Sequence, residues 1–483
     1  MVFDKSGGQF METTPVFTKI IQGGMGVNIS SWPLARTVSR LGQQGTVSGT
    51  GLERVMARIL QSGDPDGHFR RALSHFPFPH IAKKVLATFY VESGISKGVR
   101  FKGAPVFRVT PSNLLISLVI CANYAFVWLA KEGHENPVSI NYLEKIAMPH
   151  IYAITGAMLA GADFITMGAG IPLQIPDVIE DIAEGKTAHY RVPVIGKNIT
   201  SYTMSFNPEQ FFGDKLPPMK RPGFIPIISS NLLARIFKKK LPEGSVYGFV
   251  IEEPTAGGHN APPRKPTLNA HGEPEPIYGE KDVVDYSEIA ELGLPFWIGG
   301  SKASPEKLKW ALSVGAQGIQ AGSIFALCEE SGMNPEIRKK IRELGSTGKL
   351  RVRTDMRISP TGFPFKVAIL DGTMSEQSVY EARVRVCNQG ALVSLYERGN
   401  GSIGYRCAGE PVDKFVSKGG NALDTVGRGC ICNGLLSAAG LANEGEAPIV
   451  TLGDDVGFLS AVMADPSGSY SAKDAITYLL GHI

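Results

Sequence analysis

A glycine pair followed at once by a histidine is the group in this chain best suited to chemistry. It closes residues 252–259, which read Glu-Glu-Pro-Thr-Ala-Gly-Gly-His and follow the apolar run 246–251. Glycines leave main-chain N–H groups open to a phosphate or a flat ring, and a histidine can move protons near neutral pH. A strand that delivers both at its carboxyl end is typical of the active site of a parallel barrel.

Two more glycine turns follow later in the chain. The apolar run 296–298 leads into Gly299-Gly300-Ser301, and the run 318–320 leads into Ala321-Gly322-Ser323, with a helix-like segment between them. In a barrel, the loops after the seventh and eighth strands often hold a phosphate on backbone N–H groups and a short helix N-terminus. We therefore expect a phosphate group here; two ordinary turns are the alternative.

Strand-like and helix-like runs alternate through the first two-thirds of the chain, and glycines cluster after the strands. Repeated βα units favour a parallel sheet covered by helices. The strands outnumber those of a small doubly wound sheet, so we predict an α/β fold, a (β/α)8 TIM barrel with insertions at the barrel mouth and a C-terminal extension. The expected strands are 17–22, 45–48, 114–123, 150–155, 162–167, 192–197, 225–229, 246–252, 295–298 and 318–320.

The alternation fades beyond residue 335. We assign residues 1–335 to the barrel and residues 336–483 to a Cys-containing extension. Two stretches rich in proline, near 200–225 and 260–285, are predicted to be loops over the barrel mouth, since the second directly follows His259.

Composition limits the function classes. The net charge of +4 on 483 residues is too weak to indicate nucleic-acid binding. The N-terminal residues 1–8 have no apolar core, so no signal peptide is expected. The apolar run 114–130 is interrupted by Asn123 and is better explained as a buried strand entering a helix than as a membrane span. We expect a cytoplasmic protein; the sequence does not indicate its oligomeric state.

Four of the six cysteines crowd near the C-terminus, at Cys387, Cys407, Cys430 and Cys432. Four thiolates can bind zinc or hold an iron–sulfur cluster, although this spacing matches no standard ribbon or ferredoxin. Neighbouring arginines (Arg385, Arg406 and Arg428) would offset the thiolate charge. Buried free cysteines are the alternative.

The glycine motifs together resemble those of a known family. Residues 22–26 (Gln-Gly-Gly-Met-Gly), 256–259, 298–300 and 320–323 occur in the order seen in the nitronate monooxygenase family, which also includes FMN-dependent enoyl reductases. The similarity covers roughly residues 15–330. It implies a barrel that binds FMN at its carboxyl-terminal mouth.

The resemblance also implies roles for single residues. Gly24 and Met25 would lie along the isoalloxazine ring, Asn123 would end a strand and contact the ring or ribityl chain, and His259 would orient an anionic substrate or act as base. The residues implied to line the phosphate and ribityl chain are Gly257, Gly299, Gly300, Gln320, Gly322 and Ser323.

Two residues, Glu252 and Lys197, have more than one expected position relative to the flavin. The family usually has Gln where this chain has Glu252, and a carboxylate near a flavin disfavours the anionic reduced ring, so Glu252 either tunes the flavin potential or points elsewhere. Lys197, at the end of another expected strand, either faces the flavin or lies in solvent.

The leading interpretation is an FMN-dependent, nitronate monooxygenase-like oxidoreductase that oxidises alkyl nitronates with O2. The alternative is an NAD(P)H-dependent FMN reductase of an enoyl thioester or quinone. A third possibility is a flavin- or metal-carrying partner protein that docks to a multienzyme assembly. The first two interpretations differ in whether a pyridine nucleotide reduces the flavin.

Overall fold

The computed structural model describes residues 18–270, 272–443, 445–465 and 467–481. Eight parallel strands form its centre, in the order β1-β12-β11-β8-β7-β4-β3-β2. The Gln22 N–H donates to Gln44 O (2.9 Å) and the Gln44 N–H to Ile20 O (3.1 Å), which joins the two edges of the sheet. The strands are β1 (Ile20–Gln22), β2 (Gly45–Ser48), β3 (Val138–Leu143), β4 (Phe164–Gly168), β7 (Gly223–Ile228), β8 (Phe249–Glu252), β11 (Phe296–Gly299) and β12 (Gly318–Ala321). The predicted (β/α)8 barrel is confirmed.

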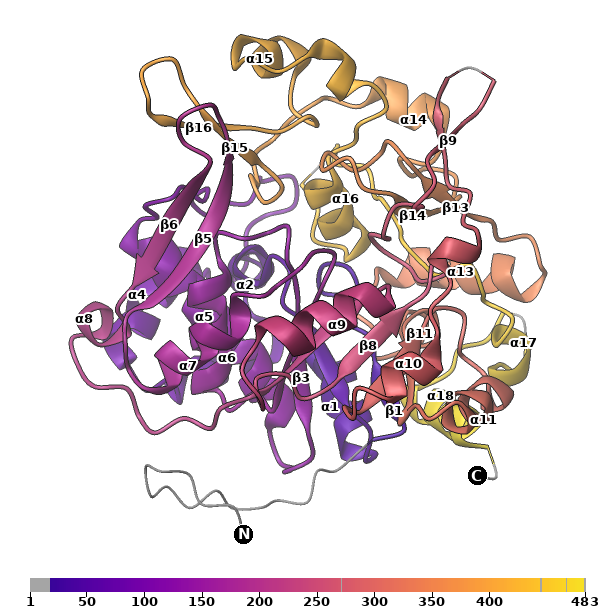
Figure 1. The fold of residues 1–483 in the computed structure, drawn as a ribbon. Helices are drawn as coiled ribbons and strands as arrows, with labels where there is room; N and C mark the ends of the chain where they lie inside the picture. Colours follow the sequence, from indigo (N-terminus) through magenta and orange to yellow (C-terminus); the bar gives the residue numbers. More distant parts are fainter. Residues whose placement is uncertain (1–17, 271, 444, 466, 482–483) are drawn as a thin grey trace.

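Helices surround the barrel (Figure 1). Between β2 and β3 the chain makes a long helical excursion, and the final helix, α18, packs against α1 and α11. The barrel is therefore covered partly by the chain's own C-terminal segment. The helices of the barrel layer are α1 (Trp32–Arg40), α2 (Leu52–Gln61), α3 (His68–Ser74), α4 (Pro79–Phe89), α5 (Asn113–Lys131), α6 (His150–Leu159), α7 (Ile175–Ala183), α9 (Asn231–Lys240), α10 (Tyr286–Ala290), α11 (Pro305–Ser313), α12 (Ser323–Ala326) and α18 (Ala472–Leu480).

Two predicted strands are wrong. Residues 114–123 belong to helix α5, which begins where the Ser112 hydroxyl accepts the Leu115 N–H, and residues 150–155 belong to α6. Both helices are buried on nearly all sides, so their sequences are apolar all round and carry no helical period. Among the described residues α5 is the one helix long and apolar enough to cross a membrane, and 83% of its apolar window is buried inside the protein.

The insertions and the C-terminal region build a second layer on the barrel. Hairpin β5–β6 (Ala188–Ile195, Ser201–Phe206) joins β15–β16 (Ser394–Glu397, Ile403–Arg406) in a sheet of order β16-β15-β5-β6. Predicted strand 192–197 thus lies outside the barrel. The remaining C-terminal elements, seen above and beside the barrel in Figure 1, are α13 (Pro335–Ser346), β13 (Val352–Asp355), β14 (Phe365–Ala368), α14 (Gln377–Ala382), α15 (Val412–Ser417), α16 (Ile431–Ala438) and α17 (Leu459–Val462).

A small apolar cluster, separate from the main core, joins four barrel strands through Ile21, Ile225, Val250 and Trp297. Such layers of bulky side chains fill the interior of a (β/α)8 barrel. Trp297 is 1% exposed and its Nε1–H donates to Thr18 O at 2.8 Å. The Trp297 ring therefore fills space inside the barrel and also makes a hydrogen bond.

We expect Trp297→Ala to lower the free energy of unfolding by about 3–5 kcal/mol, because it leaves a cavity and an unpaired carbonyl. Urea unfolding followed by circular dichroism measures the loss. Leu232→Ala, at a side chain 65% exposed on α9, should change it by less than about 0.5 kcal/mol. Equal effects of the two variants would contradict this account of the barrel interior.

Candidate active site

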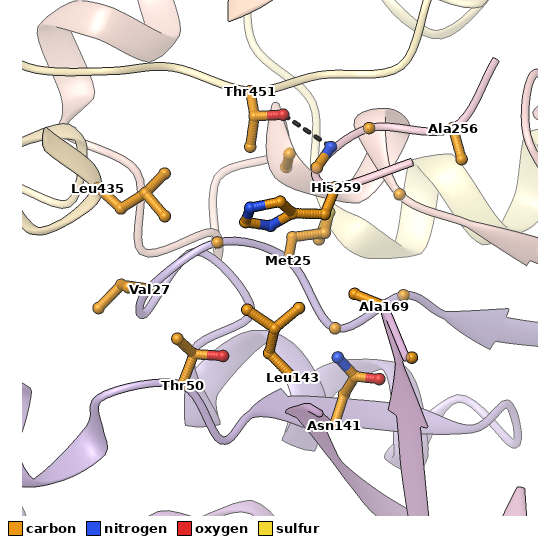
Figure 2. A pocket seen from close by; sticks show the side chains of 18 of the residues that line it. Met25, Val27, Thr50, Asn141, Leu143, Ala169, Ala256, His259, Leu435 and Thr451 are labelled. Atoms are coloured by element: carbon orange, nitrogen blue, oxygen red, sulfur yellow. Dashed lines mark hydrogen bonds between the residues drawn. The ribbon is translucent and has the colours of Figure 1, made fainter. Parts of the chain in front are cut away.

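A cavity lies at the carboxyl ends of the eight barrel strands, between them and the C-terminal region (Figure 2). We call it the mouth cavity. Every barrel strand or its following loop contributes to its wall, which is the position of active sites in this fold. Residues that line it, one from each strand in chain order, are Met25, Thr50, Asn141, Gly168, Ile227, Glu252, Gly299 and Gln320.

Most of the predicted site residues meet in this cavity. The glycine turns after β1, β8, β11 and β12 come together around it, because the carboxyl ends of parallel strands share one edge of the barrel. The predicted residues that line it are Gly24, Met25, Glu252, Gly257, His259, Gly299, Gly300, Gln320, Gly322 and Ser323.

Asn123 does not end a strand, and that prediction is wrong. It lies within α5, where its Nδ2 donates to Val119 O and its Oδ1 accepts the Tyr142 hydroxyl (2.9 Å each). It lines a smaller neighbouring cavity. Asn141, at the end of β3, reaches the mouth cavity instead. The alternation of apolar and polar residues at 138–142 (Val-Ser-Ile-Asn-Tyr) was the signal for β3 that sequence reasoning missed.

Lys197 lies at the exposed tip of the β5–β6 hairpin. Its backbone N–H donates to Glu397 Oε2 at 2.9 Å, which ties the hairpin to β15. Of the two positions expected for Lys197, the structure supports the one in solvent.

The glycine turns allow close approach of backbone to neighbouring groups. A Cβ on Gly24 would lie 2.2 Å from Asn141 Cβ, and a Cβ on Gly300 would lie 2.8 Å from Thr255 Oγ1. Gly300 also has φ +102°, a conformation that favours glycine. Larger residues would therefore displace the cavity wall at both positions.

Several buried polar groups near β11 and β12 lack partners within the described residues. They include Ser301 Oγ and Gln320 Nε2, both from residues that line the mouth cavity. Lys302 follows Ser301, is 8% exposed, and pairs with Glu253 through Nζ and Oε2 at 2.5 Å. Unpaired buried polar atoms are costly, so these groups in the cavity wall indicate contact with a polar ligand.

His259 lies in the wall of the mouth cavity, near Met25 in Figure 2. Its Nε2 is 2.8 Å from Ser359 Oγ, and its ring meets Phe365 edge-on at 4.8 Å. Burial, and then the nearby Lys145 charge, lower the pKa of His259 to about 3. The imidazole is therefore neutral at physiological pH, which differs from the proton transfer near neutrality that the sequence suggested.

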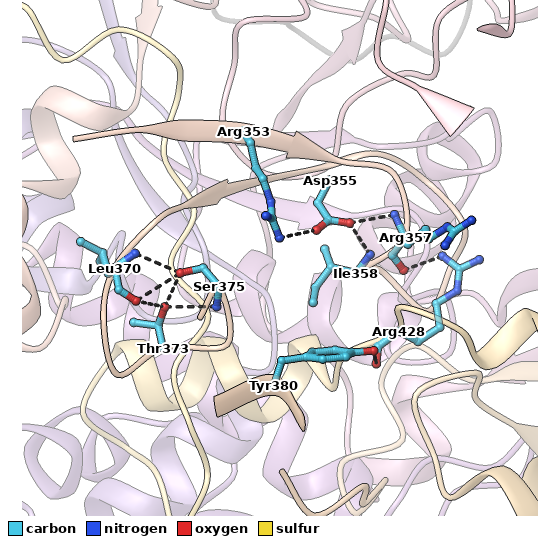
Figure 3. A network of polar contacts seen from close by, with 9 residues as sticks. All are labelled: Arg353, Asp355, Arg357, Ile358, Leu370, Thr373, Ser375, Tyr380 and Arg428. Atoms are coloured by element: carbon cyan, nitrogen blue, oxygen red, sulfur yellow. Dashed lines mark hydrogen bonds and ion pairs between the residues drawn. The ribbon is translucent and has the colours of Figure 1, made fainter. Parts of the chain in front are cut away.

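A polar network fixes the loop that carries Ser359, and Figure 3 shows its members Asp355, Arg357, Ile358 and Arg428. Asp355 Oδ1 accepts the Arg357 and Ile358 N–H groups (2.9 and 2.8 Å), and Arg428 donates to the carbonyls of Arg357 and Ser359 (2.7 Å each). The C-terminal region thereby presents the Ser359 hydroxyl to His259. Sequence reasoning missed this support, since Ser359 lies 100 positions from His259 and Arg428 lies farther still.

Glu252, in the cavity wall, interacts electrostatically with Lys145. Burial raises the pKa of Glu252 to about 8, with Lys145 opposing the rise, and burial lowers the pKa of Lys145 to about 8. Lys145 Nζ also donates to Ala169 O and lies 3.5 Å from the Phe363 ring centroid. Glu252 is thus a group able to exchange a proton near neutral pH.

The segment 451–454 of the C-terminal region crosses the Gly257-Gly258 turn. The Gly258 N–H donates to Thr451 Oγ1 (2.8 Å) and the Gly453 N–H to Ser323 Oγ (2.9 Å). Lys366 anchors this segment through Asp454, at 2.7 Å. The Gly258 amide is therefore already paired, while the Ser323 hydroxyl proton stays available to a ligand.

The expected metal centre has no support. No group of three or more His, Cys, Asp or Glu side chains in the described ranges is arranged to hold a metal ion. Burial raises the pKa of Cys430 to about 12, which keeps this thiol protonated, and Arg385 donates to the carbonyls of Ala408 and Glu410 rather than facing thiolates. The sequence spacing of Cys387, Cys407, Cys430 and Cys432 could not reveal that Arg385 binds carbonyls. Of these four cysteines, only Cys432 lines the mouth cavity.

The fold and the position of the cavity define a (β/α)8 barrel with a ligand site at its mouth. No protein-family model and no curated protein matches the sequence. The structure of FabK from Thermotoga maritima is similar in fold, with a TM-score of 0.50 and 13% identity over 98% of this chain and 96% of that chain. This likeness confirms the barrel, and it agrees in fold with the family that the motifs resemble.

Two further solved structures are less similar. A nitroalkane oxidase from Streptomyces ansochromogenes has a TM-score of 0.45 and 11% identity, over 96% of this chain and 96% of that chain. The enoyl reductase domain of MlnA from Bacillus amyloliquefaciens has a TM-score of 0.46 and 11% identity, over 95% of this chain and 93% of that chain.

Proposed function

We propose that this protein is an FMN-dependent oxidoreductase related to the nitronate monooxygenases and FMN-dependent enoyl reductases. The observation that carries the proposal is the mouth cavity itself. Four glycine turns meet there, and unpaired polar groups of Ser301 and Gln320 lie beside Lys302 at the ends of β11 and β12. These are the strand positions where a (β/α)8 barrel commonly binds a phosphate.

The residues present fit FMN. Lys302, Ser301 and the amides after β11 and β12 would hold the phosphate, and Gln320 would hold the ribityl chain or ring edge. Gly24 and Met25 would lie along the ring, together with Asn141. When bound, FMN would supply electron or hydride transfer. The chain's own residues bind and orient the ligands and exclude water from them.

Two substrate classes follow from the motifs, namely alkyl nitronates with O2 and enoyl thioesters or quinones with NAD(P)H. The neutral state of His259 favours the second class, because a neutral imidazole offers a hydrogen bond but no charge to an anionic nitronate. Around it the cavity wall is apolar, with Leu143, Leu435 and Leu436. In either class His259 would position the substrate.

We also propose that residues 1–335 form the catalytic barrel, that residues 336–483 cover it, and that the protein works in the cytoplasm on a small-molecule substrate.

An absorbance spectrum of the purified protein, followed by anaerobic reduction, tests the proposal. We expect a flavin spectrum and release of FMN on denaturation. Bleaching by NADH or NADPH would support the reductase, and bleaching by an alkyl nitronate alone would support the nitronate oxidase. Protein that neither carries nor binds FMN would contradict the proposed function.

A further inference from the structure

A second, smaller cavity shares Glu252 with the mouth cavity as a wall residue. We call it the side cavity; its wall includes Glu252, Asn260 and Arg264, and Glu252 also lines the mouth cavity. Arg264 and Ala261, a further wall residue, are exposed, so the side cavity reaches the surface. Glu252 therefore belongs to a wall shared by the ligand site and a path to solvent.

The Glu252 carboxyl differs from that of the adjacent Glu253 in its hydrogen bonding. No hydrogen bond to it occurs within the described residues, and its charged neighbour is Lys145. The adjacent Glu253 accepts from Lys302 (2.5 Å) and from the Tyr286 hydroxyl (2.6 Å). Of the two consecutive carboxylates at the end of β8, Glu252 is thus the one free to bind or release a proton.

One residue in the wall of the side cavity has a buried polar atom without a partner. Asn260 is 3% exposed, its Nδ2 donates to Ala256 O (3.0 Å), and its Oδ1 has no partner in the described part of the chain. A buried polar atom without a protein partner usually binds an ordered water. A water held at Asn260 in this cavity, whose wall also includes Glu252, would connect Glu252 with solvent.

We propose that Glu252 transfers protons between solvent and the ligand in the mouth cavity, through water held in the side cavity. In one direction the carboxyl gives its proton to the ligand and regains one from this water; in the other it does the reverse. No electrons move in this step. The proposal rests on the proposed function, because oxidation or reduction of a flavin and its substrate takes up and releases protons.

The groups that face Glu252 allow this role. Lys145 approaches from the loop after β3 and favours the charged carboxylate, and burial opposes it more strongly, so the pKa of Glu252 is raised to about 8. Burial, and then the charges of Asp282 and Glu252, raise the pKa of Tyr278 to about 12, so its hydroxyl stays protonated. His259, with its pKa lowered to about 3, cannot replace Glu252 as a proton donor at neutral pH.

The proton on Glu252 is tested first without any flavin. Infrared spectra of the flavin-free protein, titrated in steps of pH, should show a protonated carboxyl band in the wild type that persists to about pH 8 and is missing in Glu252→Gln. The surface variant Glu288→Gln, whose carboxylate pairs with Arg235 on the exterior, should keep the band. Identical spectra of wild type and Glu252→Gln would overturn the proposal.

The transfer itself is tested with FMN-loaded protein by stopped-flow spectroscopy. Glu252→Gln should slow the proton-linked phase of flavin turnover by roughly 100-fold, remove the inflection near pH 8 and change the solvent isotope effect, and Glu252→Asp should restore part of the rate. Ser229→Leu should slow the same phase, because it fills the side cavity and removes no side-chain hydrogen bond within the described residues.

Rates and isotope effects equal to the wild type in Glu252→Gln would overturn the proposal. If Glu252→Gln lowers the stability of the protein but leaves the pH profile of flavin turnover unchanged, Glu252 has only a structural role, and this result also contradicts the proposal. Failure to bind FMN would instead contradict the proposed function, and the flavin-free infrared titration then decides separately whether Glu252 holds a proton.

Discussion

Lys302→Met is expected to weaken FMN binding by roughly 10- to 100-fold, the range for losing a charge-assisted hydrogen bond. Lys302 lines the mouth cavity directly after the Gly299-Gly300 turn and is 8% exposed, so its charge acts in a partly water-excluded site. Fluorescence titration of flavin-free protein with FMN, compared with riboflavin, measures the loss. Riboflavin affinity should change little, because riboflavin lacks the phosphate.

A matched set of variants separates ligand binding from folding. Lys302→Met leaves Glu253 without its cation, and because the Glu253 side chain is 25% exposed, we expect a loss of only about 1–2 kcal/mol in unfolding free energy. The double variant Lys302→Met/Glu253→Gln should regain this stability and still bind FMN weakly. Recovery of FMN affinity in the double variant would contradict a phosphate contact for Lys302.

The C-terminal region completes the mouth cavity, although in sequence it resembled an extension. Leu435, Leu436 and Cys432 of α16 line the cavity, and the segment 451–454 crosses the Gly257-Gly258 turn. The last helix, α18, packs on α1 and α11. A truncation after the last barrel strand would therefore expose the ligand site and part of the barrel.

The barrel and its glycine turns were predictable because they depend on local signals. Short apolar strands followed by glycines recur in the chain, and a turn such as Gly299-Gly300 needs glycine for a positive φ whatever surrounds it. In the structure His259 lies in the loop after β8 and Gln320 lies in β12, and both line the mouth cavity. Long buried helices give no such signal, so α5 and α6 were taken for strands and Asn123 was misplaced.

The parts of the site that the sequence did not indicate depend on contacts between residues far apart in the chain. Ser359 positions His259, Thr451 pairs with the Gly258 amide, and Arg385 binds carbonyls rather than thiolates. No spacing in the sequence indicates such partners. The pKa of Glu252 likewise depends on burial and on Lys145, which the fold alone brings together.

His259 and His150 should destabilise the protein as the pH falls below about 6.5. Burial lowers their pKa to about 3 and about 4, whereas in the unfolded chain both titrate near about 6.5. Between about pH 6.5 and about pH 4 the unfolded chain therefore binds two protons that the folded protein does not. Each contributes at most about 1.4 kcal/mol of lost stability per pH unit.

Glu252 acts in the opposite direction. With its pKa raised to about 8, the folded protein holds a proton that the unfolded chain releases above about pH 4.5, so its stabilising effect grows as the pH falls from about 8 to about 4.5. In the window where all three titrate, Glu252 offsets one of the two histidines. The wild type should therefore lose stability more slowly on acidification than the histidines alone would dictate.

Urea unfolding at a series of pH values, with wild type and variants side by side, measures these slopes. Relative to wild type, His259→Gln should flatten the loss of stability between about pH 6.5 and about pH 4.5, and Glu252→Gln should steepen it, each by at most about 1.4 kcal/mol per pH unit. His189→Gln, at an exposed side chain on β5, serves as the control and should follow the wild type. Parallel curves for all four proteins would mean that neither buried group differs in protonation between the folded and unfolded chain. The opposite signs expected for His259 and Glu252 exclude a general loss of packing as the cause, since that would shift both curves downward without changing their slopes.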